Sequence, residues 1–340
     1  MSRSRIDSVQ VLRAIAASLV LIAHCADRSR ENGWELYDGW IGGIGVDIFF
    51  IVSGFIMAFV TAHLKGGGID AFDFVRRRIV RIAPIYWLVT LAVLLSWLFA
   101  GVEAFSGLHL DHGWKRVLGS FLFLEPRPLV LVGWTLVYEM MFYAVVAASL
   151  FLPITHMQRM VCVGILFVAF VAINFALKPA VPNAVAFVGR PMVLEFSIGT
   201  AIFLAFHNGA RIPRWLSCCL ILTAILGAAS ILSNHVTNHG HPAWIAISTA
   251  LVVGLVSLEH SIKWRRFPIV LLLGDASYSL YLIHIYIVLV IEIVFFRFIG
   301  IESAAGAIAF VVTGAAAAIG CSIAIYSHLE CHITRRFSMR

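Results

Sequence analysis

The chain has 340 residues, of which 61% are hydrophobic and only 13% are charged. Soluble domains are about 45–50% apolar and about 25% charged, so these values exclude a soluble globular protein. They also exclude a disordered chain, because disorder requires low hydrophobicity and high net charge. A transmembrane helix takes about 20 residues, so the length allows about ten spans with little left for an aqueous domain.

Ten apolar runs follow one another along the chain, and each of them predicts a membrane span. They lie at about 9–26, 41–63, 84–101, 129–152, 160–177, 184–206, 216–233, 243–258, 269–296 and 304–327. A further apolar segment at 117–124 is too short to span and favours a re-entrant or interfacial position. We therefore predict an all-α, polytopic membrane bundle of about ten transmembrane helices. It should form one domain over residues 1–340, with a core at about 6–326 and short tails.

The distribution of lysine and arginine predicts that both termini are cytoplasmic. With the N-terminus inside, the cytoplasmic segments carry sixteen of these residues and the outer loops carry eight. Cytoplasmic loops of membrane proteins have such an excess. The bias also accounts for the formal net charge of +7 without any nucleic-acid partner.

The first two runs contain ionisable side chains, which are costly in a membrane. Arg13 and His24 are eleven residues apart, so they project from nearly one helix face, roughly 16 Å apart along the axis. An imidazole can act as a general base near neutral pH. An interfacial histidine with Arg13 snorkelling inward explains the same pattern. In the second run, Asp47 needs a partner, while Gly45 and Gly54 permit close helix packing.

The segment before the third run is strongly basic. It contains Arg76, Arg77, Arg78 and Arg81, and we expect it to be a cytosolic loop. Guanidinium groups can hold phosphates through paired hydrogen bonds. Basic segments next to a membrane also bind anionic lipid or only set topology. A phosphate site, a membrane-lipid contact and a purely topological role all remain open.

The fourth run carries one carboxylate, that of Glu139, which shares a helix face with Thr135. It can orient a histidine, bind a sugar hydroxyl or pair with an arginine. In the ninth run, Ser277, Tyr281 and His284 form one polar stripe at helical spacing. This stripe either contacts an acceptor substrate or is a seam of hydrogen bonds between helices.

Two groups of histidines lie in predicted outer loops. One consists of His109 and His112, and the other of His235, His239 and His241. Neither group has the helix-borne spacing of a common zinc site, so we predict no metal centre.

Taken together, these motifs resemble the membrane acyltransferase-3 family. The chain looks like the single-domain exopolysaccharide O-acetyltransferases of that family over about residues 6–326. Five motifs carry the resemblance in the family's order. They are Arg13-x10-His24, the segment 45–55, the Arg-x-x-Arg formed by Arg78 and Arg81, Trp134-Thr-Leu-x-x-Glu139, and the segment 277–284.

The resemblance implies that His24 is catalytic, as a general base or as a transient carrier of the acyl group. It implies transfer of an acyl group, expected to be acetyl, to a hydroxyl of an extracytoplasmic or lipid-linked polysaccharide. Asp47 or Glu139 would orient or charge-stabilise the imidazole. Trp134 joins the stripe of the ninth run as an acceptor contact or a structural residue.

The resemblance also implies that Arg13 is required and that the arginine run serves the acyl donor. The donor-binding set would be Arg13, Arg77, Arg78 and Arg81. The donor would be acyl-CoA, expected to be acetyl-CoA, as a co-substrate, and no bound cofactor is implied. Guanidinium groups suit the phosphates of CoA.

The location that we expect is a bacterial-type inner (plasma) membrane, crossed several times. Some family members carry an extracytoplasmic hydrolase-like domain after the last span, whereas only a short basic tail follows Tyr326 here. We therefore expect the membrane domain to complete the transfer. The alternative is a transporter or flippase of a glycan or small solute, although the paired broken helices typical of that class are not evident. The oligomeric state stays open.

Overall fold

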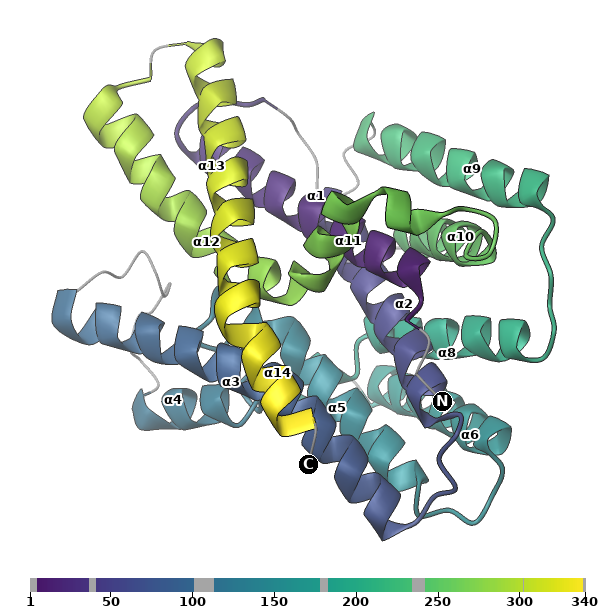
Figure 1. The fold of residues 1–340 in the computed structure, drawn as a ribbon. Coiled ribbons are helices and arrows are strands. Elements are labelled where there is room, and N and C mark those ends of the chain that lie inside the picture. The colour runs from purple at the N-terminus through teal and green to yellow at the C-terminus, as the bar shows by residue number, and fades with distance from the viewer. Residues whose placement is uncertain are drawn as a thin grey trace. The chain divides into compact units, whose positions relative to one another are not determined.

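A computed structural model of the chain describes residues 5–36, 41–100, 113–177, 183–233, 242–301 and 303–338. Within these ranges, every regular element is a helix (Figure 1). Seven helical stretches are long and apolar enough to cross a membrane. They are Asp7–Glu31, Ile41–Thr61, Gly68–Phe99, Leu131–Ser149, His156–Ala176, Ser277–Ile299 and Ala304–Thr334.

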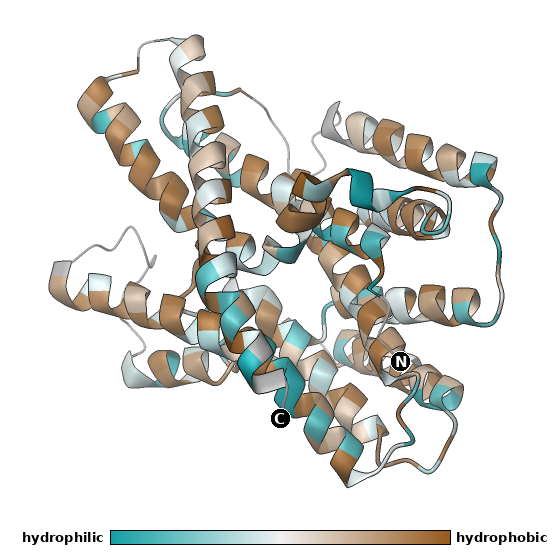
Figure 2. Ribbon diagram, in the orientation of Figure 1, coloured by the Kyte–Doolittle hydropathy of each residue, from teal (hydrophilic) through white to brown (hydrophobic). Residues whose placement is uncertain are grey.

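Three shorter apolar helices occupy the remaining predicted spans, at Pro191–His207, Arg214–Ser230 and Pro242–Ser257. Figure 2 shows that apolar residues dominate the helices along most of their length. The prediction of an all-α, multi-pass membrane bundle is therefore confirmed. The orientation of the termini stays a prediction.

The helices group into two compact units that alternate along the chain. Unit 1 comprises Met1–Val52 and Ala210–His328, and unit 2 comprises Ser53–Gly209 and Leu329–Arg340. The helix α2 (Ile41–Thr61) contributes its first part to unit 1 and its last part to unit 2.

Unit 1 is organised around the first helix. Its other elements are the first part of α2, then α9 (Arg214–Ser233), α10 (Pro242–Ser257), α11 (Pro268–Asp275), α12 (Ser277–Glu292), a π-helical turn (Ile293–Ile299) and α13 (Ala304–Ile325). The helix α1 (Asp7–Glu31) contacts α10, α11, α12 and α13, and α12 packs along α13 (Figure 1). Side chains from α1 can therefore meet side chains from α12, although the two are far apart in sequence.

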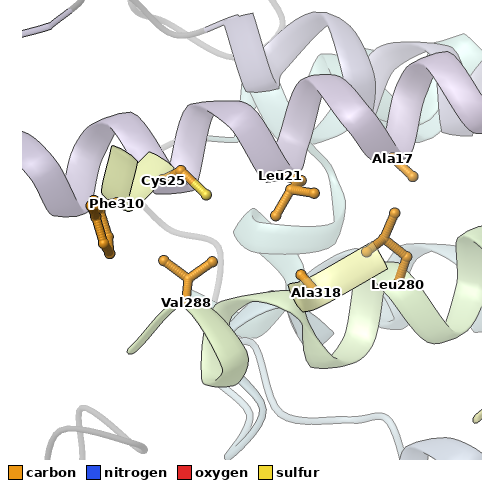
Figure 3. Close-up of a cluster of buried hydrophobic side chains, with 7 residues drawn as sticks. All are labelled: Ala17, Leu21, Cys25, Leu280, Val288, Phe310 and Ala318. Atoms are coloured by element: carbon orange, nitrogen blue, oxygen red, sulfur yellow. The ribbon is translucent and has the colours of Figure 1, made fainter. Parts of the chain in front are cut away.

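A buried apolar cluster holds α1 against α12 and α13 (Figure 3). It consists of Ala17, Leu21, Cys25, Leu280, Val288, Phe310 and Ala318. The three residues from α1 follow one another at intervals of four, which places them on one face of the helix. Helices in a membrane associate by such close packing, because lipid tails are themselves apolar.

Unit 2 contains the last part of α2 and the helices of the middle of the chain. They are α3 (Gly68–Ala100), α4 (Gly113–Phe121), α5 (Trp134–Ser149), α6 (His156–Ala176), α7 (Asn183–Val188) and α8 (Leu194–His207), joined by α14 (Cys331–Ser338) near the C-terminus. The helix α6 contacts α5 and α8, and α14 packs on α3. The helix α4 has 9 residues, which is too short to span, as the sequence predicts for its segment.

The third predicted span is wrong at its start. The helix α3 begins at Gly68 and runs through the basic segment, which is helical rather than a loop, and Pro84 lies inside it. Arginine is a good helix former, and the preceding Gly66 and Gly67 have positive φ values of 99° and 101°, which glycine tolerates. The turn therefore falls before the arginines and not after them.

The ninth predicted span is also corrected, because the run 269–296 is two helices. The chain turns at Ala276, where α11 ends and α12 begins. Tertiary contacts hold α11 in place: Arg5 Nη1 donates to Asp275 at 2.9 Å, and a Cβ atom at Gly274 would collide with the backbone carbonyl of Gln10. Hydropathy cannot detect a break that such contacts stabilise.

Candidate active site

Two histidines from opposite ends of the chain meet in unit 1. The ring of His24 on α1 lies against that of His284 on α12, with centroids 5.2 Å apart and planes inclined by 37°. Leu280, His284 and Val288 follow one another at intervals of four on α12, so they share one face of that helix. The apolar cluster of Figure 3 thus includes the residues one turn before and one turn after His284.

The ring of His284 is buried and its orientation is set by its own helix. Its side chain is 1% exposed, and Nδ1 lies 3.0 Å from the carbonyl oxygen of Leu280 and 2.9 Å from that of Tyr281. His24 is only partly buried. His24 is therefore the less buried of the two rings.

The other members of the predicted polar stripe are buried beside His284. Ser277 is completely buried, and its hydroxyl has no hydrogen-bond partner in the part of the chain that the structure describes. The ring of Tyr281 meets that of Phe49 edge-on, with the ring centroids 5.6 Å apart. The centroids of Tyr281 and His284 are 6.2 Å apart. The stripe exists as predicted, but its role as an acceptor contact or as a seam stays a prediction.

Arg13 and Asp47 are buried polar residues of the same unit. Arg13 is 8% exposed and donates from Nη1 to Gln10 at 3.3 Å. Asp47 on α2 is completely buried. A Cβ atom at Gly45 would lie 2.5 Å from the carbonyl oxygen of Ala16, so the backbone of α2 approaches α1 closely. This approach explains why the sequence has glycine two residues before the buried carboxylate.

An ion pair beyond the histidines was not predicted as part of the site. Arg28 donates from Nε and Nη2 to Glu292 at 2.7 and 3.0 Å, and Asn32 donates to the same carboxylate at 2.7 Å. Arg28 also pairs with Glu31. The signal in the sequence is the spacing: Arg28 is one turn beyond His24, and Glu292 is two turns beyond His284.

In unit 2, Glu139 has several polar neighbours. It accepts hydrogen bonds from Ser53 at 3.1 Å and from the hydroxyl of Tyr143. The guanidinium group of Arg78 also interacts with this carboxylate electrostatically. The sequence predicted that Glu139 orients a histidine, binds a sugar hydroxyl or pairs with an arginine. Of these three partners, the structure places an arginine near the carboxylate.

The predicted donor-binding arginines of α3 differ in burial. Arg78 is 8% exposed, and its guanidinium carbon lies 5.8 Å from the ring centroid of Phe74. Arg77 and Arg81 are only partly buried. Since they are four residues apart, they share a helix face. Of the predicted donor-binding arginines of α3, Arg77 and Arg81 are thus the two that are not buried.

Trp134, the first residue of α5, belongs to an aromatic group in unit 2. Its ring meets that of Tyr138 edge-on, with the ring centroids 6.1 Å apart, and the centroids of Tyr138 and Phe187 are 4.8 Å apart. Arg190 places its guanidinium carbon 5.3 Å from the centroid of Phe187. The sequence predicted a role for Trp134 alone. Tyr138 is one turn further along the same helix, whereas Phe187 and Arg190 come from a distant part of the chain, which helical spacing cannot predict.

The two histidine groups that were considered as metal ligands lie outside the described residues. They are His109 and His112, and His235, His239 and His241.

Comparison with known proteins identifies the family. The acyltransferase-3 model, described as an acyltransferase domain, matches residues 6–327. The exopolysaccharide production protein ExoZ of Rhizobium meliloti (strain 1021) is 34% identical over 311 residues, which are 87% of this chain and 90% of ExoZ. The acyltransferase MdmB of Streptomyces mycarofaciens is 25% identical over 320 residues, which cover 84% of this chain and 79% of MdmB. No solved structure matches the chain significantly. The chain therefore belongs to the acyltransferase-3 family and is a membrane acyltransferase.

Proposed function

We propose that this protein transfers an acetyl group from acetyl-CoA to a hydroxyl of a polysaccharide, free or lipid-linked, at a bacterial inner membrane. The similarity to ExoZ, whose name places it in exopolysaccharide production, supports the class of acceptor. The observation that carries the proposal is the pairing of His24 with His284 in the packed core of α1 and α12. It supplies a base that is held in place and only partly buried.

In the proposed reaction, His24 acts as the general base. A ring nitrogen accepts the proton of the acceptor hydroxyl as its oxygen bonds to the acyl carbon. The bond from this carbon to sulfur then breaks, and the leaving thiolate takes the proton from His24. The products are the acyl ester and free CoA thiol, and the enzyme returns to its starting state.

The donor is held by arginines in this proposal. Arg77 and Arg81 share one face of α3 and are partly exposed, so they are suited to the phosphate groups of CoA. Arg78 is buried beside Phe74 and instead supports the helix that presents them. Arg13, on the helix of His24, completes the set that we assign to the donor.

The test uses purified protein in liposomes with radiolabelled acetyl-CoA and an isolated glycan acceptor. We expect label to enter the glycan with the wild-type protein and not with His24→Ala, at equal insertion. Glu35→Gln, which alters an exposed residue just beyond α1, serves as the control and should remain active. Equal labelling by His24→Ala and the wild type would overturn the proposal. Glycan uptake without labelling would favour the transporter reading.

A further inference from the structure

The buried ring of His284 lies against the partly buried ring of His24. We propose that His284 is a positioning residue: its Nε2 accepts a hydrogen bond from one nitrogen of His24 and thereby fixes the tautomer and direction of that ring. The other nitrogen of His24 then carries the lone pair that takes the proton of the substrate. This inference rests on the proposed role of His24 as the base.

The hydrogen bonds of His284 determine which of its ring nitrogens carries the hydrogen. Its Nδ1 lies within 3.0 Å of two backbone carbonyl oxygens, those of Leu280 and Tyr281. A carbonyl oxygen can only accept, so Nδ1 must donate and must carry the hydrogen. In the neutral ring, Nε2 is then left with a lone pair and can only accept.

The lone pair of Nε2 is buried and available. Within the described residues, Nε2 of His284 has no hydrogen-bond partner, and the side chain is 1% exposed. A buried polar atom without a partner costs about 1–3 kcal/mol. A donor that reaches Nε2 would recover part of this cost.

His24 can supply the donor. The ring centroids are 5.2 Å apart, so nitrogens on facing edges of the two rings can approach to about 3 Å, the length of a hydrogen bond. The torsion that turns a histidine ring is broad, so His24 can rotate into line. Leu280 and Val288, one turn before and after His284, pack against the face of α1 that carries Leu21 and Cys25 (Figure 3). The two rings are thus held together.

Charged groups near the pair do not compete for this bond. Arg28 is a charged neighbour of His24, but a cation cannot accept a hydrogen bond. The carboxylate of Glu292, on the helix of His284, already accepts from Arg28 and Asn32. The neutral Nε2 is therefore the acceptor that the packing of α1 and α12 offers to His24.

During transfer, His284 neither gains nor loses a proton. The hydroxyl proton moves to the outward nitrogen of His24, while the inward N–H stays bonded to Nε2 of His284. The proton leaves again with the thiolate, and the pair is restored. A base that is oriented by a third group is the general arrangement of activated nucleophile sites.

Two substitutions separate positioning from structural support. In His284→Asn, the amide reaches the place of Nδ1 and can still donate to the carbonyls of α12, but nothing replaces Nε2. In His284→Gln, the terminal carbonyl reaches the place of Nε2 and can accept from His24. We expect kcat to fall about 100-fold in His284→Asn, since misorientation of a catalytic group costs about that much. The KM values should change little, and His284→Gln should recover most of the rate.

The assay is steady-state acetyl transfer in liposomes, with thermal unfolding as a check on folding. The positioning role would be overturned if folded His284→Asn kept the kcat of the wild type. It would also be overturned if folded His284→Asn and folded His284→Gln lost kcat to the same extent. If either variant fails to fold, the hydrogen bond is sought directly by ¹⁵N NMR of labelled histidines in the wild-type protein. A coupling between the two rings would support the proposal, and its absence would refute it. If the wild-type protein transferred no acetyl groups, or if His24→Ala transferred them at the wild-type rate, the proposed function itself would be wrong.

Discussion

Arg28 on α1 and Glu292 on α12 form a two-point ion pair, with both nitrogen–oxygen distances at or below 3.0 Å. The pair lies one turn beyond His24 and two turns beyond His284, so it ties together the helices that present the two rings. Asn32 donates to the same carboxylate. The side chains of Arg28 and Glu292 are 27% and 12% exposed, which leaves the bond only partly screened by solvent.

The first prediction is that Glu292→Gln destabilises the protein. The substitution removes the charge that holds Arg28 while it keeps the shape of the side chain. Breaking a charged hydrogen bond at a partly buried position costs about 1–3 kcal/mol, and we expect thermal unfolding in detergent to show this loss. The matched control is Glu31→Gln, since Glu31 also pairs with Arg28 but is 57% exposed. Equal effects of the two substitutions would contradict the account.

The second prediction concerns the acyl donor. Arg77→Ala and Arg81→Ala should each raise the KM for acetyl-CoA about 10-fold, which corresponds to about 1.4 kcal/mol. The rate at saturating donor should change less, because the arginines contact phosphates and not the reacting carbon. Arg211→Ala, which alters an exposed arginine elsewhere, is the control. An unchanged KM would return the basic segment of α3 to a role in topology or lipid contact.

The third prediction tests the close packing of α2. A Cβ atom at Gly54 would overlap the backbone carbonyl of Phe196 on α8, and backbone atoms cannot yield as a flexible side chain can. Gly54→Ala should therefore destabilise the protein by about 1–3 kcal/mol. Gly320 on α13 has nothing within 4 Å of its Cβ position, so Gly320→Ala should be neutral or stabilising by about 0.5–1 kcal/mol. If Gly320→Ala lowered the thermal unfolding temperature more than Gly54→Ala does, the helices would pack differently from this description.

The fourth prediction concerns Glu139. Glu139→Ala leaves Tyr143 and Ser53 without the acceptor that they share, and it removes an electrostatic partner of buried Arg78. We expect a loss of about 1–3 kcal/mol in stability. Ser53→Ala removes a single donor and should cost less. A Glu139→Ala variant that is as stable as the wild type would show that these contacts do not support unit 2.

Periodicity and hydropathy predicted the helical bundle and much of the histidine site. The run of the first helix placed Arg13 and His24 on one face, and both are on α1. The stripe of Ser277, Tyr281 and His284 is buried as its spacing suggests. These features follow from the repeat of a single helix, so one sequence is enough to predict them.

Features that depend on contact between distant helices could not be predicted. The pairing of Arg28 with Glu292 requires α1 to lie against α12, and the spacing within either helix does not predict that contact. The division of the ninth run at Ala276 depends on contacts with the start of the chain. The contact between the rings of His24 and His284 joins residues that are 260 positions apart, so helical spacing alone carries no information about it.

The most direct test of the central claim is the acyl content of the glycan, measured by mass spectrometry in a host that makes the acceptor. The host would carry either the wild-type protein or His24→Ala at equal abundance in the membrane. The account predicts that acetyl groups are present with the wild-type protein and absent with His24→Ala, while glycan export continues. Normal acetylation with His24→Ala, with or without a loss of export, would contradict it.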